Sequence, residues 1–321
     1  MQVNTHAANA AAIDRMSGLR ASIAGLQAQI STGNRIAAPD DDPAGAAHTV
    51  QLNRALAINA ADQTGIDRAT SRLNSVDTAL GGVSTLLESV KELALKGATA
   101  TLGPADRATL AAAVGQLAEQ LLSYANTRDS DGNALFGGAR TGTAYAADAT
   151  GTVSWQGAGT AARLTLDSGS IMTSFDGPAV FARLDGGTTL PAPAVPPAVT
   201  PAPVPIVTNV FALLTGLRAA LAEPDAVIRA HGMANALTGL DAAIGRTADS
   251  RALAGTRLAR LTTESTRLDA GKLALETDLS KTDSLDAASA IAQLQQQITV
   301  LQAAQLSFVK IGALSLWDLL R

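Results

Sequence analysis

The chain has 321 residues, of which 47% are apolar but only 3% aromatic, and its formal net charge is −4. The sequence has no block of lysines and arginines, so nucleic-acid binding has little support, and the absence of cysteine excludes disulfides and cysteine-ligated zinc. The first residues lack the basic and apolar regions of a cleaved signal peptide. The sequence has no run of about 18 apolar residues, so no membrane-spanning segment is predicted.

The first periodic segment predicts a helix that ends near residue 32. Four apolar residues with spacings of 4, 3 and 4 form one stripe on this helix: Leu19, Ile23, Leu26 and Ile30. Gly33 suits the end of a helix, where a positive φ is common, and Pro39 prevents easy continuation.

The stretch DDDP at residues 40–43 follows this break. Asp42 before Pro43 has the pattern of an N-cap followed by the first helical residue. Asp40 and Asp41 then lie near the positive end of the helix dipole. A metal site would need more oxygen ligands converging on the ion. We therefore interpret Asp41, Asp42 and Pro43 as a helix cap and joint, with no metal.

A much longer helix is predicted from residue 44 to about residue 96. At ~1.5 Å per residue it would be about 80 Å long, which is typical of a rod. Its apolar residues keep the 3–4 spacing of a coiled-coil seam: Ile66, Ala69, Leu73, Val76, Leu80, Val83, Leu87, Val90 and Ala94. A third helix is predicted after Pro104.

Within the turn-rich stretch at residues 126–140, residues 129–140 begin like a calcium-binding loop. Asp129, Asp131 and Asn133 match the first three ligand positions. Ala134 stands where such a loop needs glycine, and Arg140 stands where it needs glutamate. A turn is therefore predicted.

Residues 141–190 are predicted to form a small β-rich insert with its own core. Segments with β-forming residues alternate with glycine-rich turns between about Tyr145 and Leu184. The insert contains Trp155, Phe175 and Phe181. Residues 191–205 contain seven of the twelve prolines, which predicts an extended linker.

Helices are predicted again after the linker. One begins near Val210, and a longer one begins at Pro224. The last helix carries an apolar stripe that continues into an aromatic-containing end: Ile291, Leu294, Ile298, Leu301, Phe308, Ile311, Leu316 and Trp317.

The predicted fold class is mainly α, with a long antiparallel helical rod made from both chain ends and a small β-rich insert in the middle. The predicted domains are the terminal segments 1–42 and 285–321, the rod 43–140 with 206–284, the insert 141–190 and the linker 191–205. A single pair of helices at the chain ends is only marginally stable in water unless it packs on something else. We therefore expect them to fold on neighbouring copies or partners, with the stripes on residues 19–30 and 291–317 as the assembly interface.

No pattern in the sequence predicts an enzyme or a cofactor. The three histidines, His6, His48 and His231, are far apart, and no HExxH motif is present. The nucleophile pattern GxSxG is also absent, as are the phosphate-binding GxxxxGK[ST] and GxGxxG patterns.

Three stretches resemble known families. QISTGNRIAAPDDDPAGAA at residues 29–47 resembles the N-terminal signature of the bacterial flagellin superfamily. ANTRDSDGNALFGG at residues 125–138, and the C-terminal end from residue 294 to 320, resemble a narrower group within it, the flagellar hook–filament junction proteins. The resemblance covers about residues 1–140 and 225–321, and the middle is similar only in plan.

This resemblance implies a structural protein, extracellular in the bacterial flagellum. It would be exported unfolded through the flagellar type III channel, without a cleaved signal peptide, and would bind an export chaperone through its C-terminal part. Copies would form a ring between the neighbouring hook junction protein and flagellin, with the terminal helices lining the inner tube. One alternative is flagellin itself, the filament subunit. Another is a secreted coiled-coil effector or adhesin unrelated to motility.

Overall fold

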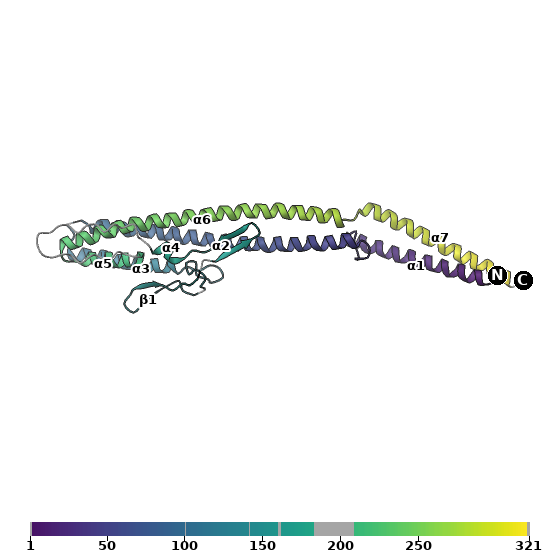
Figure 1. The fold of residues 1–321 in the computed structure, drawn as a ribbon, viewed down its shortest axis with the longest axis horizontal. Coiled ribbons are helices and arrows are strands. Elements are labelled where there is room, and N and C mark those ends of the chain that lie inside the picture. The colour runs from purple at the N-terminus through teal and green to yellow at the C-terminus, as the bar shows by residue number, and fades with distance from the viewer. Residues whose placement is uncertain (1, 100, 141, 160–161, 183–208, 320–321) are drawn as a thin grey trace. The chain divides into compact units, whose positions relative to one another are not determined.

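The computed structural model describes residues 2–99, 101–140, 142–159, 162–182 and 209–319, and the side chains of residues 2–6, 8 and 311–319 are not described. The predicted mainly α fold with a small β-rich insert is confirmed (Figure 1). The chain separates into two compact units: residues 1–61 with 268–321 form unit 1, and residues 62–267 form unit 2. The elements in chain order are α1 (Gln2–Thr32), α2 (Pro43–Gly97), α3 (Pro104–Ala125), β1 (Tyr145–Ala147), β2 (Val153–Trp155), β3 (Arg163–Leu166), β4 (Gly169–Met172), α4 (Gly177–Phe181), α5 (Val210–Ala222), α6 (Ala226–Asp283) and α7 (Ala287–Leu319).

Unit 1 contains α1, α7, the beginning of α2 and the end of α6. The α1 and α7 helices pack side by side along their length (Figure 1). Two short segments, residues 33–42 and 284–286, connect this pair to α2 and α6. The predicted domain boundaries fall in these segments, whereas the division between the compact units falls within α2 and α6.

The predicted seam on α2 forms the main core of unit 2. All nine apolar residues of the seam are buried, from Ile66 to Ala94. The α6 helix contributes Leu240, Ala254 and Leu261 to the buried residues of unit 2. At roughly 1.5–3 kcal/mol for each large apolar side chain that leaves water, this seam is the largest single source of stability among the described elements.

Polar contacts across the seam show that α2 and α6 are antiparallel, because partner numbers fall along α6 as they rise along α2. The three pairs in unit 2 are Gln63 Nε2 to Ser265 Oγ at 2.9 Å, Arg251 Nε to Asp77 Oδ1 at 2.9 Å, and Lys91 Nζ to Asp241 Oδ1 at 2.5 Å.

The α3 and α5 helices pack against each other in unit 2 and add a second layer (Figure 1). Pro104 begins α3, as predicted. Seven residues of α5 are buried, and Leu214 and Leu217 among them are fully buried. The α6 helix begins at Ala226, whereas the sequence predicted a start at Pro224. The Asp225 carboxylate accepts the N–H groups of Val227 and Ile228 and so acts as the N-cap of α6.

The β-rich region consists of two antiparallel hairpins, β1–β2 and β3–β4. The sequence analysis predicted that this insert has its own core, but its aromatic residues share a core with residues outside it. The Phe181 ring packs edge-on against Phe136 at 5.2 Å between centroids, and Tyr145 packs against Phe211 of α5 at 5.2 Å. Phe136 and Phe211 lie outside residues 141–190, so this core is shared with the helices of unit 2. The proline-rich linker at 191–205 lies outside the described residues.

Candidate assembly interface

The predicted stripe on α1 lies on its half-buried side. Leu19, Ile23, Leu26 and Ile30 are all partly covered, and α1 packs against α7. On α7, Leu294, Ile298, Leu301 and Phe308 are also partly covered. The structure thus brings the two predicted stripes together as one helix pair.

Three predicted interface residues near the C-terminus, Ile311, Leu316 and Trp317, lie within α7, but their side chains are outside the described part. Ile291 is at the edge of the stripe and is 43% exposed.

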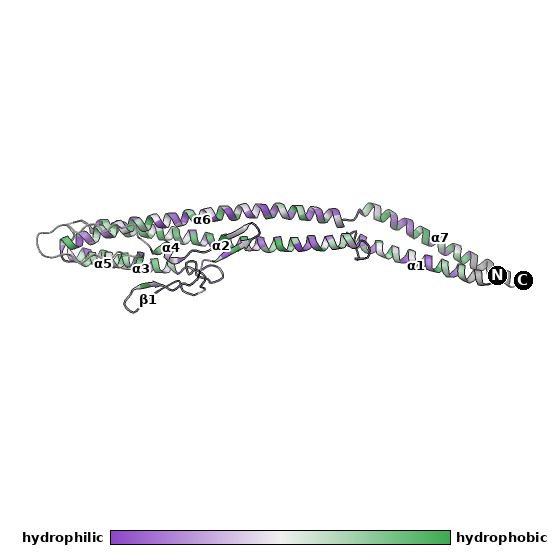
Figure 2. Cartoon of the chain, in the orientation of Figure 1, coloured by the Kyte–Doolittle hydropathy of each residue, from purple (hydrophilic) through white to green (hydrophobic). Residues whose placement is uncertain are grey.

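A second apolar flank of α7 was missed by the sequence analysis. Leu306 and Val309 are each 68% exposed, and hydrophobic residues recur along this helix (Figure 2). Their separation of three residues places them on one side of the helix, and the stronger periodicity of the covered stripe concealed this signal. Burying the exposed parts of these two side chains would contribute roughly 2–4 kcal/mol, which favours burial against a partner.

Unit 1 has little core of its own. Its buried apolar residues, among the described residues, are Leu52, Leu268 and Ala290, and each of them is still a few per cent exposed. A pair of helices covers only one side of each member, so the opposite sides of α1 and α7 remain in water. The free energy available from burial is therefore much smaller in unit 1 than along the seam of unit 2.

The segments at residues 33–42 and 284–286 form a joint with paired backbones. Asn34 and Ser284 form an isolated antiparallel bridge. The Arg35 N–H donates to the Asp283 carbonyl at 2.6 Å, and the Leu285 N–H donates to the Gly33 carbonyl at 3.1 Å. Gly33 has φ of 75°, the left-handed conformation that glycine adopts without a steric penalty at a helix end.

Asp42 has the geometry of an N-cap for α2, which begins at Pro43. Its Oδ1 accepts the N–H of Gly45 at 2.9 Å, and its Oδ2 accepts a hydrogen bond from Arg35 at 2.9 Å. These interactions favour the ionised carboxylate, and the hydrogen bond from Gly45 is the main reason that the pKa of Asp42 lies below its ordinary value of 3.8.

The two preceding carboxylates differ from Asp42. Asp41 Oδ2 accepts the N–H groups of Ala37 and Ala38, at 3.1 and 2.9 Å, and so stabilises the turn before α2 rather than the helix end. Asp40 is exposed. The triplet therefore contains one cap, one turn-stabilising residue and one exposed carboxylate.

The turn at residues 126–140 is organised by Asp129. Its Oδ1 accepts the N–H groups of Asp131 and Asn133, and its Oδ2 forms a largely buried ion pair with Arg72 of α2 at 2.5 Å. The carboxylate is thus occupied by backbone and guanidinium donors. Among the described residues, no three histidine, aspartate or glutamate side chains are placed to hold a metal ion.

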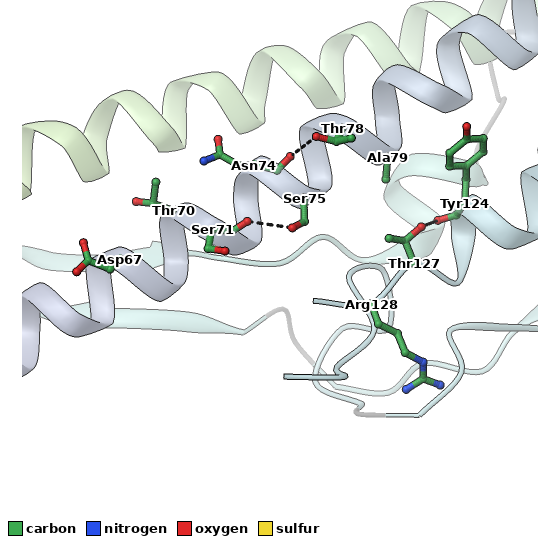
Figure 3. Close-up of a pocket in the computed structure, with 10 residues that line it drawn as sticks. All are labelled: Asp67, Thr70, Ser71, Asn74, Ser75, Thr78, Ala79, Tyr124, Thr127 and Arg128. Atoms are coloured by element: carbon green, nitrogen blue, oxygen red, sulfur yellow. Dashed lines mark hydrogen bonds between the residues drawn. The ribbon is translucent and has the colours of Figure 1, made fainter. Parts of the chain in front are cut away.

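A groove of about 680 Å³ in unit 2 is lined by residues 67–79 of α2 and by Tyr124, Thr127 and Arg128. The hydroxyls of Ser75 and Thr78 are bonded to carbonyls of their own helix, and the lining side chains point in different directions (Figure 3). Neither His48 nor His231 lines it. Its lining includes Asp67 and Ser71 but no histidine.

None of the described helices combines the length and apolar character needed to cross a bilayer.

The chain is similar to flagellar proteins in sequence. Residues 3–141 match the family model for the bacterial flagellin N-terminal helical region. Flagellar hook-associated protein 3 of Escherichia coli is 29% identical over 298 residues, which cover 91% of this chain and 90% of the relative. The protein of the same name from Salmonella typhimurium is 27% identical and covers 92% of both chains.

The fold is similar to those of solved flagellar proteins. The crystal structure of flagellar hook-associated protein 3 from Legionella pneumophila aligns with a TM-score of 0.62 and 18% identity, covering 72% of this chain and 98% of that one. The flagellar junction protein FlgL from the same species aligns with a TM-score of 0.55 and 19% identity, covering 66% and 98%. At these identities the likeness shows a shared fold.

Proposed function

We propose that the chain is a member of the flagellin superfamily, that it joins the hook side of a bacterial flagellum to the filament, and that its copies assemble into a ring through α1 and α7. The observation that carries this proposal is the similarity to flagellar hook-associated protein 3 along about nine-tenths of both chains. A match restricted to the superfamily's N-terminal region would not separate a junction protein from flagellin.

The structure of unit 1 supports assembly through the terminal helices. The α1–α7 pair leaves Leu306 and Val309 of α7 in water, and Ile13 of α1 is also more than half exposed. Apolar side chains on helices with little core of their own favour burial against other chains. In a ring, one face of each copy would pack on a different face of the next copy.

The partners of such a junction protein are copies of itself, a neighbouring hook protein and flagellin. Export in an unfolded state through the flagellar type III channel also belongs to this proposal, as does an export chaperone that binds the C-terminal part. The small core of unit 1 is compatible with export, since a weakly stabilised segment unfolds at a low free-energy cost.

A gene-deletion strain tests the function. For a junction protein, we expect cells that make hooks but lack attached filaments, with flagellin released into the medium as monomer. Complementation with the intact gene should restore swimming. Loss of the main filament polypeptide itself would instead identify the chain as flagellin, and normal swimming after deletion would contradict any role in the flagellum.

A further inference from the structure

The β3–β4 hairpin of unit 2 has one apolar face. Leu164 and Leu166 are two residues apart on β3, and Ile171 pairs with Leu164, so all three side chains lie on the same side. Leu166 and Ile171 are buried, whereas the strand residues on the opposite side are exposed. Because a two-stranded hairpin is only marginally stable in water by itself, its order depends on packing against the helices of unit 2.

Gly65 of α2 accommodates the Leu164 side chain of this hairpin. A Cβ atom on Gly65 would lie 2.9 Å from Leu164 Cδ1, which is closer than two carbon atoms normally approach. Glycine in the interior of a helix is destabilising relative to alanine. The contact with Leu164 gives a physical reason for glycine at this position.

The α6 helix contacts the hairpin through a row of charged residues. They follow one another at intervals of 3, 4 and 3, which places them on one side of the helix: Arg257, Arg260, Glu264 and Arg267.

Arg257 contacts the base of the hairpin, just after β4. Its Nη1 donates to the Ser174 carbonyl at 3.1 Å, and its guanidinium carbon lies 4.3 Å from the centre of the Phe175 ring. Arg260 Nη2 lies against Gly169, where β4 begins. One face of α6 therefore follows the hairpin from its base towards its turn.

The turn of the hairpin reaches the end of unit 2. Hydrogen bonds from Arg267 and then from Ser168 of the turn hold the pKa of Glu264 below its ordinary value of 4.5. The pKa of Arg267 is raised chiefly by the hydrogen bond with Glu264, and the charges of Asp167 and Asp62 add to this effect. Asp62 and Arg267 are the residues at which unit 2 ends on α2 and on α6.

A pair of helices leaves one side of its seam open unless a third element covers it. The α3 helix does not cover the seam beside the hairpin, because its last turn, at Tyr124, lies against Gly82 of α2. Ile66 and Leu261 nevertheless have exposed fractions of only 2% and 0%. The apolar face of the hairpin supplies the missing third side.

We propose that the β3–β4 hairpin is a strap that covers the α2–α6 seam between α3 and the end of unit 2, with Gly65 as its contact on α2 and Arg257 as the residue that holds its base on α6. Detaching this strap exposes the seam beside it, so the stability of unit 2 falls there first. The proposal concerns unit 2 alone, and it does not depend on a role at a flagellar junction.

Amide hydrogen exchange of the purified full-length chain tests the proposal with three reporters. The Thr173 N–H, which donates to the Ala162 carbonyl at 2.8 Å, reports the hairpin. The Leu261 N–H reports the seam beside the hairpin, and the Leu87 N–H reports whether the rest of unit 2 stays folded.

Gly65→Leu keeps a good helix former in α2 but places a side chain where Leu164 lies. We expect the Thr173 and Leu261 amides to exchange about tenfold faster, with the Leu87 amide unchanged. The matched control is Gly245→Leu, because Gly245 is exposed on α6 and a Cβ there would have no neighbour within 4 Å.

Arg257→Ala tests the other attachment and should speed exchange of the Thr173 amide about fivefold. Arg257→Lys should restore part of the protection, because lysine keeps the positive charge but lacks the planar fork. The control is Arg218→Ala, which removes an exposed arginine that lies against Gly115 of α3.

Three outcomes would overturn the proposal. Exchange of the Thr173 amide at the rate of an unstructured peptide in the unmodified chain would show that the hairpin is not docked. Equal exchange in Gly65→Leu and Gly245→Leu would show that it needs no contact with Gly65. Fast exchange at Thr173 with unchanged exchange at Leu261 would show that the hairpin does not protect the seam. If Gly65→Leu also loses protection at Leu87, Arg257→Ala decides, and protection of Thr173 equal to that in Arg218→Ala contradicts the strap.

Discussion

At the scale of single residues, the carboxylates at positions 40–42 have different roles although they are adjacent. Asp42 binds the first turn of α2 and Arg35, Asp41 binds two backbone N–H groups of the preceding turn, and Asp40 is exposed. Side-chain oxygens that accept backbone N–H groups compete with metal binding for the same lone pairs. The joint therefore uses carboxylates for local hydrogen bonding.

The stability contributed by Asp42 should depend on pH. Its pKa in the folded chain is below the ordinary value of 3.8, so the contribution is complete above pH 3.8 and is lost as the pH falls through the lowered folded pKa. We expect Asp42→Ala to destabilise unit 1 at pH 7 and to have little effect at a pH well below that folded value. Urea unfolding at both pH values, followed by circular dichroism, measures this difference.

Asp40→Ala is the matched control for this measurement, because it removes an adjacent exposed carboxylate. It should leave the unfolding midpoint unchanged at pH 7. An equal loss of stability in Asp42→Ala at both pH values would contradict an electrostatic role and would point to helix propensity alone.

At the scale of elements, the buried seam of α2 determines the stability of unit 2. Leu80 and Leu87 are fully buried between helices, whereas Leu95 on the same helix is 52% exposed. The residue type and the helix are the same, so only the surroundings differ. The spacing of the seam predicted this difference, because Leu95 is outside the 3–4 pattern.

Leu80→Ala should lower the free energy of unfolding by about 2–5 kcal/mol, because it removes buried methyl groups and leaves a cavity. Leu95→Ala should change the free energy by less than about 0.5 kcal/mol. Guanidinium unfolding of both variants measures the two values. Similar losses in the two variants would mean that the seam does not lie between helices as described.

At the scale of the whole molecule, the two units differ in how much apolar surface they bury. Unit 2 contains the seam of α2, the buried face of α5 and the aromatic cluster of Phe136, Tyr145, Phe181 and Phe211. Unit 1 has few fully buried side chains among its described residues. This asymmetry suits a protein in which one part is stable by itself and the other is completed by neighbours.

Deletion of residues 285–321 should abolish assembly and leave unit 2 folded, because these residues form α7 and belong to unit 1. The thermal transition of unit 2 should persist in circular dichroism. In a strain that lacks the gene, the truncated chain should not restore swimming, whereas the full-length chain should. Restored swimming with the truncated chain would contradict the assignment of α7 to assembly.

The sequence predicted most helices, and it predicted domain boundaries near the two segments at residues 33–42 and 284–286, because these features depend on local signals. The spacing of apolar residues identifies the buried face of α2, and glycine, proline and aspartate mark helix ends. The β-rich region was also recognisable from its turns and β-forming residues. The start of α6 was displaced by two residues, because the capping residue is Asp225 and the proline before it lies outside the helix.

The partners of the joint could not be predicted in the same way. Arg35 has no local pattern that distinguishes it from other exposed arginines, and its acceptor at Thr282 is about 250 residues away in the chain. Arg72 and Asp129 are also far apart in the sequence, as are Phe211 and Tyr145, so no local pattern predicted these two contacts.

The sequence by itself therefore determined the elements of this protein: the helical class, the long seam, the capped break at Asp42 and the absence of disulfides. Only the tertiary structure decided which elements share a core, which flank of α7 stays in water and which arginine connects the joint to the end of α6. The physical reason is that periodicity and capping act over a few residues. Packing and ion pairing instead depend on which distant segments come into contact, and the spacing of residues along the chain does not predict those contacts.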